Sequence, residues 1–395
     1  MTYNLDEVLD RAGTNSIKWN YRNDVFGSDD VLPLWVADMD FPCPPSVTEA
    51  LVERAKHPIY GYPGRPEAFF QSVVKWIERR FDVEPNRDWM TPVPGVVTGL
   101  HVAIDAFTKP GDKVVIQPPV YHPFFKAIEN RGRHIVENPL TEDNGHYRMD
   151  LEDLKEKIDA RTRMIILCSP HNPIGRVWTK EELQELTDIC IENDIFIVSD
   201  EIHSDLIYEK GTHTPFYSLS KEAAAQSLTF IAPSKTFNLA GLAASIAIAG
   251  DDKIHREFSN TMAKAGIFHI NLFGMEALQA AYNNGEEWLE DVLHYLHDNA
   301  EYVHEFLQER IPQVKMAVPE ATYLGWMDFR ELGMYGEELN DFIVQKARLG
   351  FNAGKMFGKQ GDGFQRINFA CPRSILEEAM ERLEQAVNEI NQQKR

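Results

Sequence analysis

The feature that most constrains the fold is a series of short, continuous apolar runs separated by helical segments. Each run has the length of one strand, and they lie at 114–117, 164–168, 195–199, 228–231 and 244–250. Runs that are apolar on both faces are typical of parallel strands covered by helices on both sides. Helical periodicity fills 179–194, where Thr179 and Glu182 predict a capping box. This order of strand, helix and strand predicts an α/β domain with a mostly parallel sheet.

The pattern changes after residue 285, which indicates a second domain. A long helix is expected over 285–311, short strands at 322–330 and 366–370, and a final helix from Ser374. These elements predict a smaller α+β domain built from residues 1–45 and 286–395. The large α/β domain then covers 46–285 and begins with helices at 46–57 and 67–81. A chain of 395 residues is long enough for two or three domains of ordinary size.

Composition excludes several classes of partner. The chain has 61 acidic and 40 basic residues and a formal net charge of −21, which repels nucleic acids and anionic membranes. Its four cysteines form no C-x-x-C pair, so neither a disulfide framework nor a zinc site is expected. No signal peptide and no membrane-spanning apolar run are visible. We therefore expect a soluble, cytoplasmic protein.

Three polar segments follow apolar runs of the predicted sheet. Asn172 lies in SPHNPIGRVWT (169–179), Asp200 in SDEIHSD (199–205) and Lys235 in APSKTFNLAG (232–241). Ligands of open parallel sheets bind beyond the carboxyl ends of the strands, where these residues are expected to meet. A lysine partly desolvated in such a place can act as a neutral nucleophile. Alone, each residue is an ordinary surface lysine, helix cap or turn former, but the combination predicts a binding site.

This combination resembles the fold-type-I pyridoxal-phosphate enzymes of the aminotransferase superfamily. The resemblance rests on NPxG, DE, SK and RxN in this order, and extends from PLWVADMDF (33–41) to RINFACPRS (366–374). The segments YGYP, VADMDF, SDEIHSD and SKTFNLAG are similar to the cystathionine β-lyase, or cysteine-S-conjugate β-lyase, branch of MalY- and PatB-like proteins. The resemblance implies a large domain of the pyridoxal-phosphate-dependent transferase type and pyridoxal 5′-phosphate as the cofactor.

The resemblance also implies roles for individual residues. Lys235 would bind the cofactor covalently as a Schiff base and, once freed, act as the general base. Asp200 would pair with the pyridine nitrogen and keep the ring protonated. Asn172 and His203 would contact the phenolic oxygen, and Tyr121 in PPVYHPF would stack on the ring. Lys235, Asp200 and Tyr121 are thus the predicted catalytic residues.

The phosphate is expected at PGVVTG (94–99), where a glycine turn opens a helix and its N–H groups favour an anion. The predicted contacts are Gly95, Val96 and Val97, with the hydroxyl of Ser234. Many relatives carry a basic residue eight positions after the lysine. This chain has Ala243 there, so that phosphate contact is absent.

Two further residues are assigned by the resemblance. Tyr62 in YGYP matches a tyrosine that reaches the phosphate in the neighbouring subunit, which implies a homodimer with shared sites. Arg366 matches the arginine that binds the α-carboxylate of an amino-acid substrate. No metal site is predicted, because His294, His297 and His304 share one helix without an accompanying acid–base motif.

Three functions are consistent with these residues. The first is β-elimination from L-cystathionine or another cysteine thioether, which yields pyruvate, ammonia and a thiol. The second is an aminotransferase on the same scaffold, and the third is a regulatory protein that retains the cofactor site. The similarity of SKTFNLAG and SDEIHSD to the lyase branch favours the first. The preferred thioether stays open.

Overall fold

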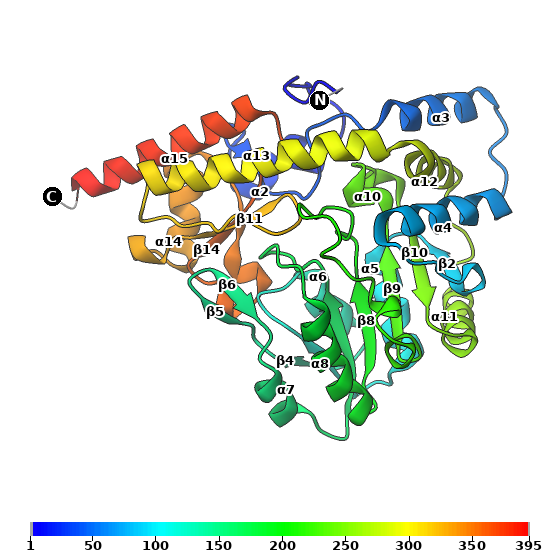
Figure 1. Ribbon diagram of the computed structural model, residues 1–395. Helices are drawn as coiled ribbons and strands as arrows, with labels where there is room; N and C mark the ends of the chain where they lie inside the picture. Colours follow the sequence, from blue (N-terminus) through cyan, green and yellow to red (C-terminus); the bar gives the residue numbers. More distant parts are fainter. Residues whose placement is uncertain (1–2, 394–395) are drawn as a thin grey trace.

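The central element of the fold is a seven-stranded sheet (Figure 1). The computed structural model describes residues 3–393. Among the strands of this sheet, β10 alone runs opposite to the other six. In spatial order the strands are β2 (Met90–Val93), β10 (Ser245–Ala249), β9 (Ser227–Ile231), β8 (Phe196–Asp200), β7 (Thr162–Cys168), β3 (Lys113–Ile116) and β4 (His134–Glu137).

Helices cover both faces of the sheet, which explains why its strands are apolar on both sides. One face packs against α5 (Val96–Phe107), α6 (Pro123–Asn130) and α11 (Asp252–Lys264). The other face packs against α7 (Leu151–Lys157) and α8 (Lys180–Glu192). The predicted capping box is confirmed, because Thr179 accepts a bond from the N–H of Glu182, whose side chain accepts from the N–H of Thr179.

A second group of helices packs with one end of the sheet in a further hydrophobic cluster. Its main members are α3 (Pro45–Lys56), α4 (Glu67–Phe81) and α12 (Leu272–Asn284), and the first two match the predicted helices at 46–57 and 67–81. The large α/β body also contains shorter elements. They are α9 (Lys221–Ala224), α10 (Pro233–Thr236) and the hairpin of β5 (Thr141–Asp143) and β6 (His146–Arg148).

The C-terminal part is a small antiparallel sheet beside two long helices. The sheet order is β11 (Leu324–Asp328), β14 (Phe364–Asn368) and β13 (Asn352–Ala353). Helices α13 (Glu286–Arg310) and α15 (Arg373–Gln393) lie side by side above it, with α14 (Gly336–Asp341) at its edge (Figure 1).

The N-terminal segment joins this C-terminal part through one pair of strands. β1 (Leu32–Pro33) is parallel to β12 (Leu349–Gly350), after the short helices α1 (Ile17–Asn20) and α2 (Arg22–Phe26). The fold class, an α/β body with a smaller α+β part, is therefore confirmed. The domain division at residues 45 and 285 stays a prediction.

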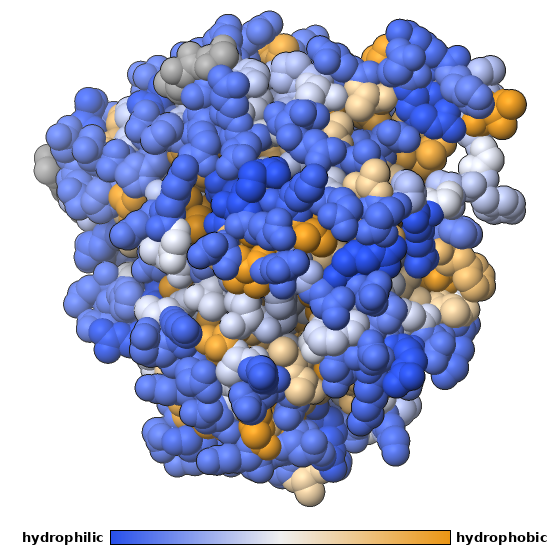
Figure 2. Space-filling view, turned by 45° about the vertical axis from the view of Figure 1, so that its right-hand side comes forward, coloured by the Kyte–Doolittle hydropathy of each residue, from blue (hydrophilic) through white to orange (hydrophobic). Residues whose placement is uncertain are grey.

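The outer surface is largely hydrophilic on the face that Figure 2 displays, with small hydrophobic groups scattered between polar residues. None of the helices within residues 3–393 combines the length and the apolar character needed to cross a bilayer.

Candidate active site

The predicted site residues meet in one cavity of about 460 Å³ at the carboxyl ends of β7, β8 and β9. Of the predicted residues, Gly95, Val96, Val97, Tyr121, Asn172, Asp200, His203, Ser234, Lys235 and Arg366 line it. A larger hollow of about 650 Å³ lies between the β5–β6 hairpin and the end of α13, and none of the predicted site residues lines it. The candidate active site is therefore the smaller cavity.

Strand ends and tight turns place the three central side chains. Asp200 is the last residue of β8, and Lys235 lies in the short helix α10 directly after β9. Asn172 follows β7 in a turn closed by the hydrogen bond from the N–H of Gly175 to the carbonyl of His171. Gly175 has a φ of +70°, and a Cβ there would lie 2.3 Å from the Cβ of Pro319, so this turn requires glycine.

Lys235 has the environment of a nucleophilic amine. Its side chain is partly buried in the cavity wall, and Nζ donates a hydrogen bond of 2.6 Å to the carbonyl oxygen of Ala37. Burial, and then the positive charge of Arg366, lower the pKa of the Lys235 amine to about 8. A substantial fraction of the Lys235 amine is therefore unprotonated slightly above pH 7, as a nucleophile or general base requires.

Asp200 is a buried carboxylate that still has room for a cationic or N–H partner. It accepts one hydrogen bond of 3.2 Å, from the backbone N–H of Ile202. Burial raises the pKa of Asp200 to about 7, and the neighbouring charge of Glu201 contributes to the rise. Within the described part of the chain no basic side chain lies within ion-pair distance of it. A protonated ring nitrogen would fit this carboxylate by supplying the missing donor and charge.

Arg366 presents an uncompensated positive charge to the cavity. It lies on β14 and is fully buried, and burial lowers its pKa to about 10, so it stays charged at neutral pH. Its guanidinium donates to Asn172 Oδ1 at 3.0 Å and to Asn352 Oδ1 at 2.6 Å. No carboxylate of residues 3–393 forms an ion pair with it. These neutral contacts orient the guanidinium and leave its charge available to an anion.

The aromatic residues of the cavity are uncharged at neutral pH. Burial raises the pKa of Tyr121 to about 12, and its ring makes edge contacts with His122 at 5.4 Å and Phe124 at 5.7 Å between centroids. The ring of His203 lies edge-on to Tyr323, and its Nδ1 is a buried atom for which the described residues supply no hydrogen-bond partner. Burial and the charge of Lys235 lower the pKa of His203 well below its ordinary value.

The predicted phosphate end has backbone donors in place of side-chain cations. Helix α5 begins at Val96 after Gly95, whose φ is +93°, and the hydroxyl-bearing Ser234 lies on the same cavity. Among the lining residues that the structure describes, Lys235 and Arg366 are the only lysine and arginine. Ala243, the position without a basic residue, also lines the cavity. An anion here would depend on N–H groups and the helix dipole.

Tyr62 is the one predicted site residue outside the cavity. Its side chain is 95% exposed in the segment between α3 and α4, with its ring 6.0 Å from that of His269. Within one chain Tyr62 therefore contributes nothing to the cavity that holds Lys235.

Sequence reasoning assigned no role to several residues that line the cavity. They are Trp35, Val36, Ala37, Thr98, His122, Cys168, Ile202, Asn352 and Met356. Trp35 to Ala37 lie in the quoted PLWVADMDF segment, which could have been assigned to the site from its position in the motif. His122 directly follows Tyr121 and could have been assigned with it. Asn352 lies in the two-residue strand β13 and Met356 in a short 3-10 helix after it, and the sequence there shows no regular pattern.

Comparisons with known proteins agree with this geometry. Residues 29–383 match the family described as aminotransferase class I and II. The chain is 43% identical to the cystathionine β-lyase PatB of Bacillus subtilis (strain 168), covering 98% of this chain and 100% of that protein. The crystal structure of cystalysin from Treponema denticola, which contains a pyridoxal 5′-phosphate cofactor, superposes with a TM-score of 0.95 at 37% identity, covering 99% of this chain and 100% of that chain. The pyridoxal-phosphate-bound C–S lyase from Staphylococcus hominis gives a TM-score of 0.91 at 31% identity and covers 98% of each chain. These matches show that the chain belongs to the class I and II aminotransferase family, together with the cystathionine β-lyase PatB.

Proposed function

We propose that this chain is a pyridoxal-phosphate-dependent carbon–sulfur β-lyase that cleaves L-cystathionine or related cysteine thioethers. The observation that carries the proposal is the convergence of Lys235, Asp200 and Arg366 in one cavity. These residues supply a partly neutral amine, a buried carboxylate that needs a cationic partner and an unpaired guanidinium. The similarity to PatB and to structures of C–S lyases favours this reaction over others on the same scaffold.

The residues of the cavity fit pyridoxal 5′-phosphate. Lys235 would bind the aldehyde carbon of the cofactor. Asp200 would pair with the ring nitrogen, whose positive charge would offset the cost of burying that carboxylate. Asn172 and His203 would contact the phenolic oxygen, and Tyr121 the ring. Gly95, Val96, Val97 and Ser234 would hold the phosphate. When bound, the cofactor would accept electron density from the α-carbon of the substrate.

The side chains of this protein would then perform the remaining tasks. Arg366 would bind the α-carboxylate in a pair of charge-assisted hydrogen bonds. The neutral amine of Lys235 would take the α-proton, after which the bond between Cβ and sulfur breaks and the thiolate takes a proton. Water then replaces the nitrogen, so that one thioether and one water give one thiol, one pyruvate and one ammonium ion.

The rest of the wall is suited to the sulfur-bearing arm of the substrate. It includes Trp35, His122 and Met356, which none of the cofactor or carboxylate roles uses. Burial and the charge of Arg366 lower the pKa of His122 to about 4, so this part of the wall is uncharged at neutral pH. The buried Nδ1 of His122 has no hydrogen-bond partner among residues 3–393 and can form a hydrogen bond with a polar atom of the arm.

We propose that the working unit is a homodimer in which Tyr62 reaches the cofactor phosphate of the partner. Support comes from its 95% exposure outside the cavity of its own chain, beside the exposed side chains of Ile59, Tyr60 and Phe268. Exposed apolar side chains grouped in this way are typical of an interface with another protein.

This proposal predicts complementation between two inactive variants. Tyr62→Ala and Lys235→Ala proteins are each expected to be impaired, because one loses a phosphate contact and the other the reactive amine. Hybrid dimers formed by mixing them contain one site with both residues intact, so pyruvate release should recover to roughly a quarter of the wild-type rate, by statistical pairing of subunits with one intact site in half of the dimers. A monomer by light scattering at assay concentration, or no recovery after verified subunit exchange, would exclude the shared site.

We also propose the predicted domain division and a cytoplasmic location. The division into residues 46–285 against 1–45 with 286–395 is supported by the separate sheets of the two parts and by the β1–β12 pair. A cytoplasmic location is supported by four cysteines that are free within the described chain.

Product analysis separates the lyase from an aminotransferase. Both would bind the same amino acid through Arg366 and use Lys235 as the base, but only transamination consumes a keto acid. The experiment therefore compares L-cystathionine with and without an added keto acid. Pyruvate and thiol without the acceptor support the lyase, whereas conversion that requires the acceptor supports the aminotransferase.

A further inference from the structure

The segment Trp35–Phe41 passes along the cavity and is here called the strap. Its main-chain carbonyls accept hydrogen bonds from the reactive residues. The carbonyl of Trp35 accepts from Arg366 Nη2 at 3.0 Å, and that of Ala37 accepts from Lys235 Nζ at 2.6 Å and from the hydroxyl of Tyr323 at 2.9 Å. The strap thus touches both the proposed carboxylate-binding group and the proposed base.

Two asparagines fasten the strap to the strands and turns that carry those reactive residues. Asn368, two residues after Arg366, donates to the carbonyls of Val36 and Asp38 at 2.6 Å each. Asn238, three residues after Lys235, accepts from the N–H of Met39 at 3.0 Å and donates to two strap carbonyls at 2.9 Å. The asparagines of RINFA and SKTFNLAG therefore serve the strap.

A cluster of four charged residues also fixes the strap; its members are Arg11, Lys18, Asp38 and Asp40. Lys18 is completely buried, and its Nζ lies 2.6 Å from Asp40 Oδ2. Arg11 pairs with Asp38 at 2.8 Å and with Asp40 at 2.7 Å, and the indole N–H of Trp19 donates to Asp40 at 2.8 Å. Burial opposes ionisation of Asp40, but Lys18 and Arg11 hold its pKa below the ordinary value.

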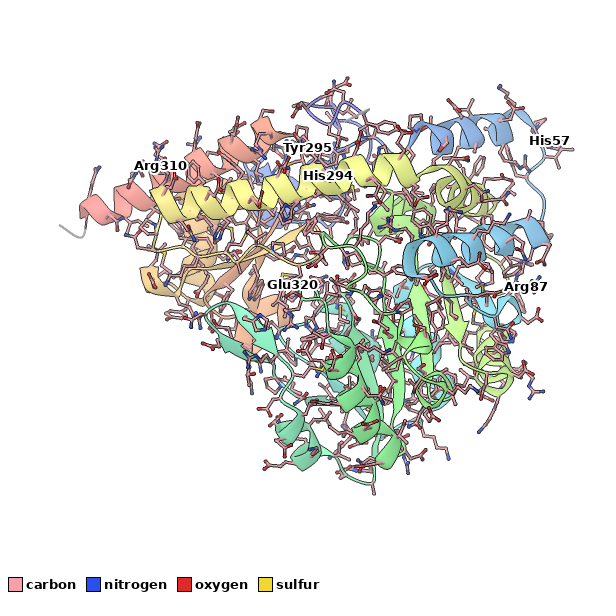
Figure 3. All side chains as sticks on the ribbon, in the orientation of Figure 1. His57, Arg87, His294, Tyr295, Arg310 and Glu320 are labelled. Atoms are coloured by element: carbon pink, nitrogen blue, oxygen red, sulfur yellow. The ribbon has the colours of Figure 1, made fainter. Side chains whose placement is uncertain are left out.

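The basic members of this cluster come from the N-terminal segment that lies against α13. Asp6 accepts a hydrogen bond from Tyr295, which Figure 3 labels on that helix beside the N-terminal segment. The indole N–H of Trp35 donates to the carbonyl of Lys18 at 3.3 Å. A wall of the cavity is therefore held in place by residues 11–19, far from it in sequence.

We infer that the strap is a positioning element that orients Arg366 and Lys235 through its carbonyls, and that Arg11 and Lys18 are positioning residues that hold it. A buried lysine that served only to fill space could be replaced by an apolar residue. Here, however, the two cations Arg11 and Lys18 neutralise two carboxylates of the strap itself, Asp38 and Asp40. Loss of one cation leaves a carboxylate of the strap with too little compensating positive charge. The main chain next to Trp35 and Ala37 then becomes more mobile. The expected effect on catalysis rests on the proposed function.

The test uses the holoenzyme of an Arg11→Gln variant. Arg11 is 22% exposed, so its loss is less damaging to folding than the loss of the fully buried Lys18. Hydrogen exchange of peptides that cover 35–41 is expected to become faster. KM for L-cystathionine should rise about tenfold, with a smaller change in kcat, because Arg366 loses its orientation before the substrate binds. Arg11→Lys retains the cation and should recover most of the wild-type KM.

Arg133→Gln is the matched control. Arg133 is a buried arginine that pairs with Asp105 at 3.2 Å, but it directly precedes β4 and does not line the cavity. This variant is expected to lower the melting temperature without changing KM or exchange in 35–41. If Arg11→Gln does not fold, Asp38→Asn tests the same cluster, because it removes the ion pairs of Asp38 with Arg11 and Lys18 and leaves the Lys18–Asp40 pair intact.

Unchanged KM together with unchanged exchange in 35–41 would overturn the inference and leave the cluster with a structural role alone. The same holds if the Arg133 variant shows equal changes. Absence of lyase turnover in the wild-type enzyme would contradict the proposed function instead. The exchange measurement requires no turnover, so it still decides whether Arg11 holds the strap.

Discussion

Replacing Lys235 by alanine is expected to lower turnover of L-cystathionine by about a thousandfold or more, because one side chain supplies both the covalent attachment and the base. Burial and Arg366 keep the pKa of this amine at about 8, which prepares it for both tasks. The measurement is pyruvate release by the purified variant, with its visible absorbance and a borohydride-reducible adduct recorded in parallel. Both spectroscopic signals should be lost with the activity.

Lys253→Ala provides the control for this substitution. Lys253 is exposed on α11 and does not line the cavity, so the variant should keep wild-type turnover and its yellow colour. A Lys235→Ala protein that still forms the reducible adduct would show that another amine binds the cofactor.

Asp200→Asn is expected to lower kcat by at least about a hundredfold, equivalent to two factors of ten at 1.4 kcal/mol each. The amide keeps the size of the side chain but removes the charge that stabilises a protonated ring nitrogen. The buried carboxylate has one backbone donor, from Ile202, so the substitution leaves the local chain intact. The measurement is steady-state kinetics at saturating cofactor.

Asp205→Asn is a suitable comparison because Asp205 belongs to the same SDEIHSD segment and is also buried. It accepts hydrogen bonds from Trp76 and Thr236 and does not line the cavity. Its replacement should reduce thermal stability with less than a tenfold change in kcat. Near-normal turnover in Asp200→Asn would mean that Asp200 does not pair with the cofactor.

The fold was predictable where the sequence pattern depends on local chemistry. Continuous apolar runs found five strands of the sheet, and the Thr179–Glu182 spacing found the start of α8. The antiparallel direction of β10 was not predictable, because an apolar strand such as Ser245–Ala249 reads the same in either direction. β2 and β4 were also missed, since MTPV contains a proline and HIVE begins and ends with polar residues.

The site was predictable where residues belong to short motifs at strand ends. Asn172, Asp200 and Lys235 each lie within four residues of a strand, so parallel strands bring them together. The contacts of Arg11 and Lys18 were not predictable, because they join residues 20 or more positions apart through an irregular segment. The partners of a main-chain carbonyl depend on the path of the chain, which side-chain patterns do not describe.

Incubation of the purified enzyme with L-cystathionine and pyridoxal 5′-phosphate, without any keto acid, tests the central claim most directly. The lyase account predicts pyruvate, ammonia and thiol in equal amounts over many turnovers, because each complete cycle returns Lys235 to its starting state and no keto acid is needed. If no pyruvate appears, while an added keto acid is converted to the corresponding amino acid, the β-lyase account is contradicted.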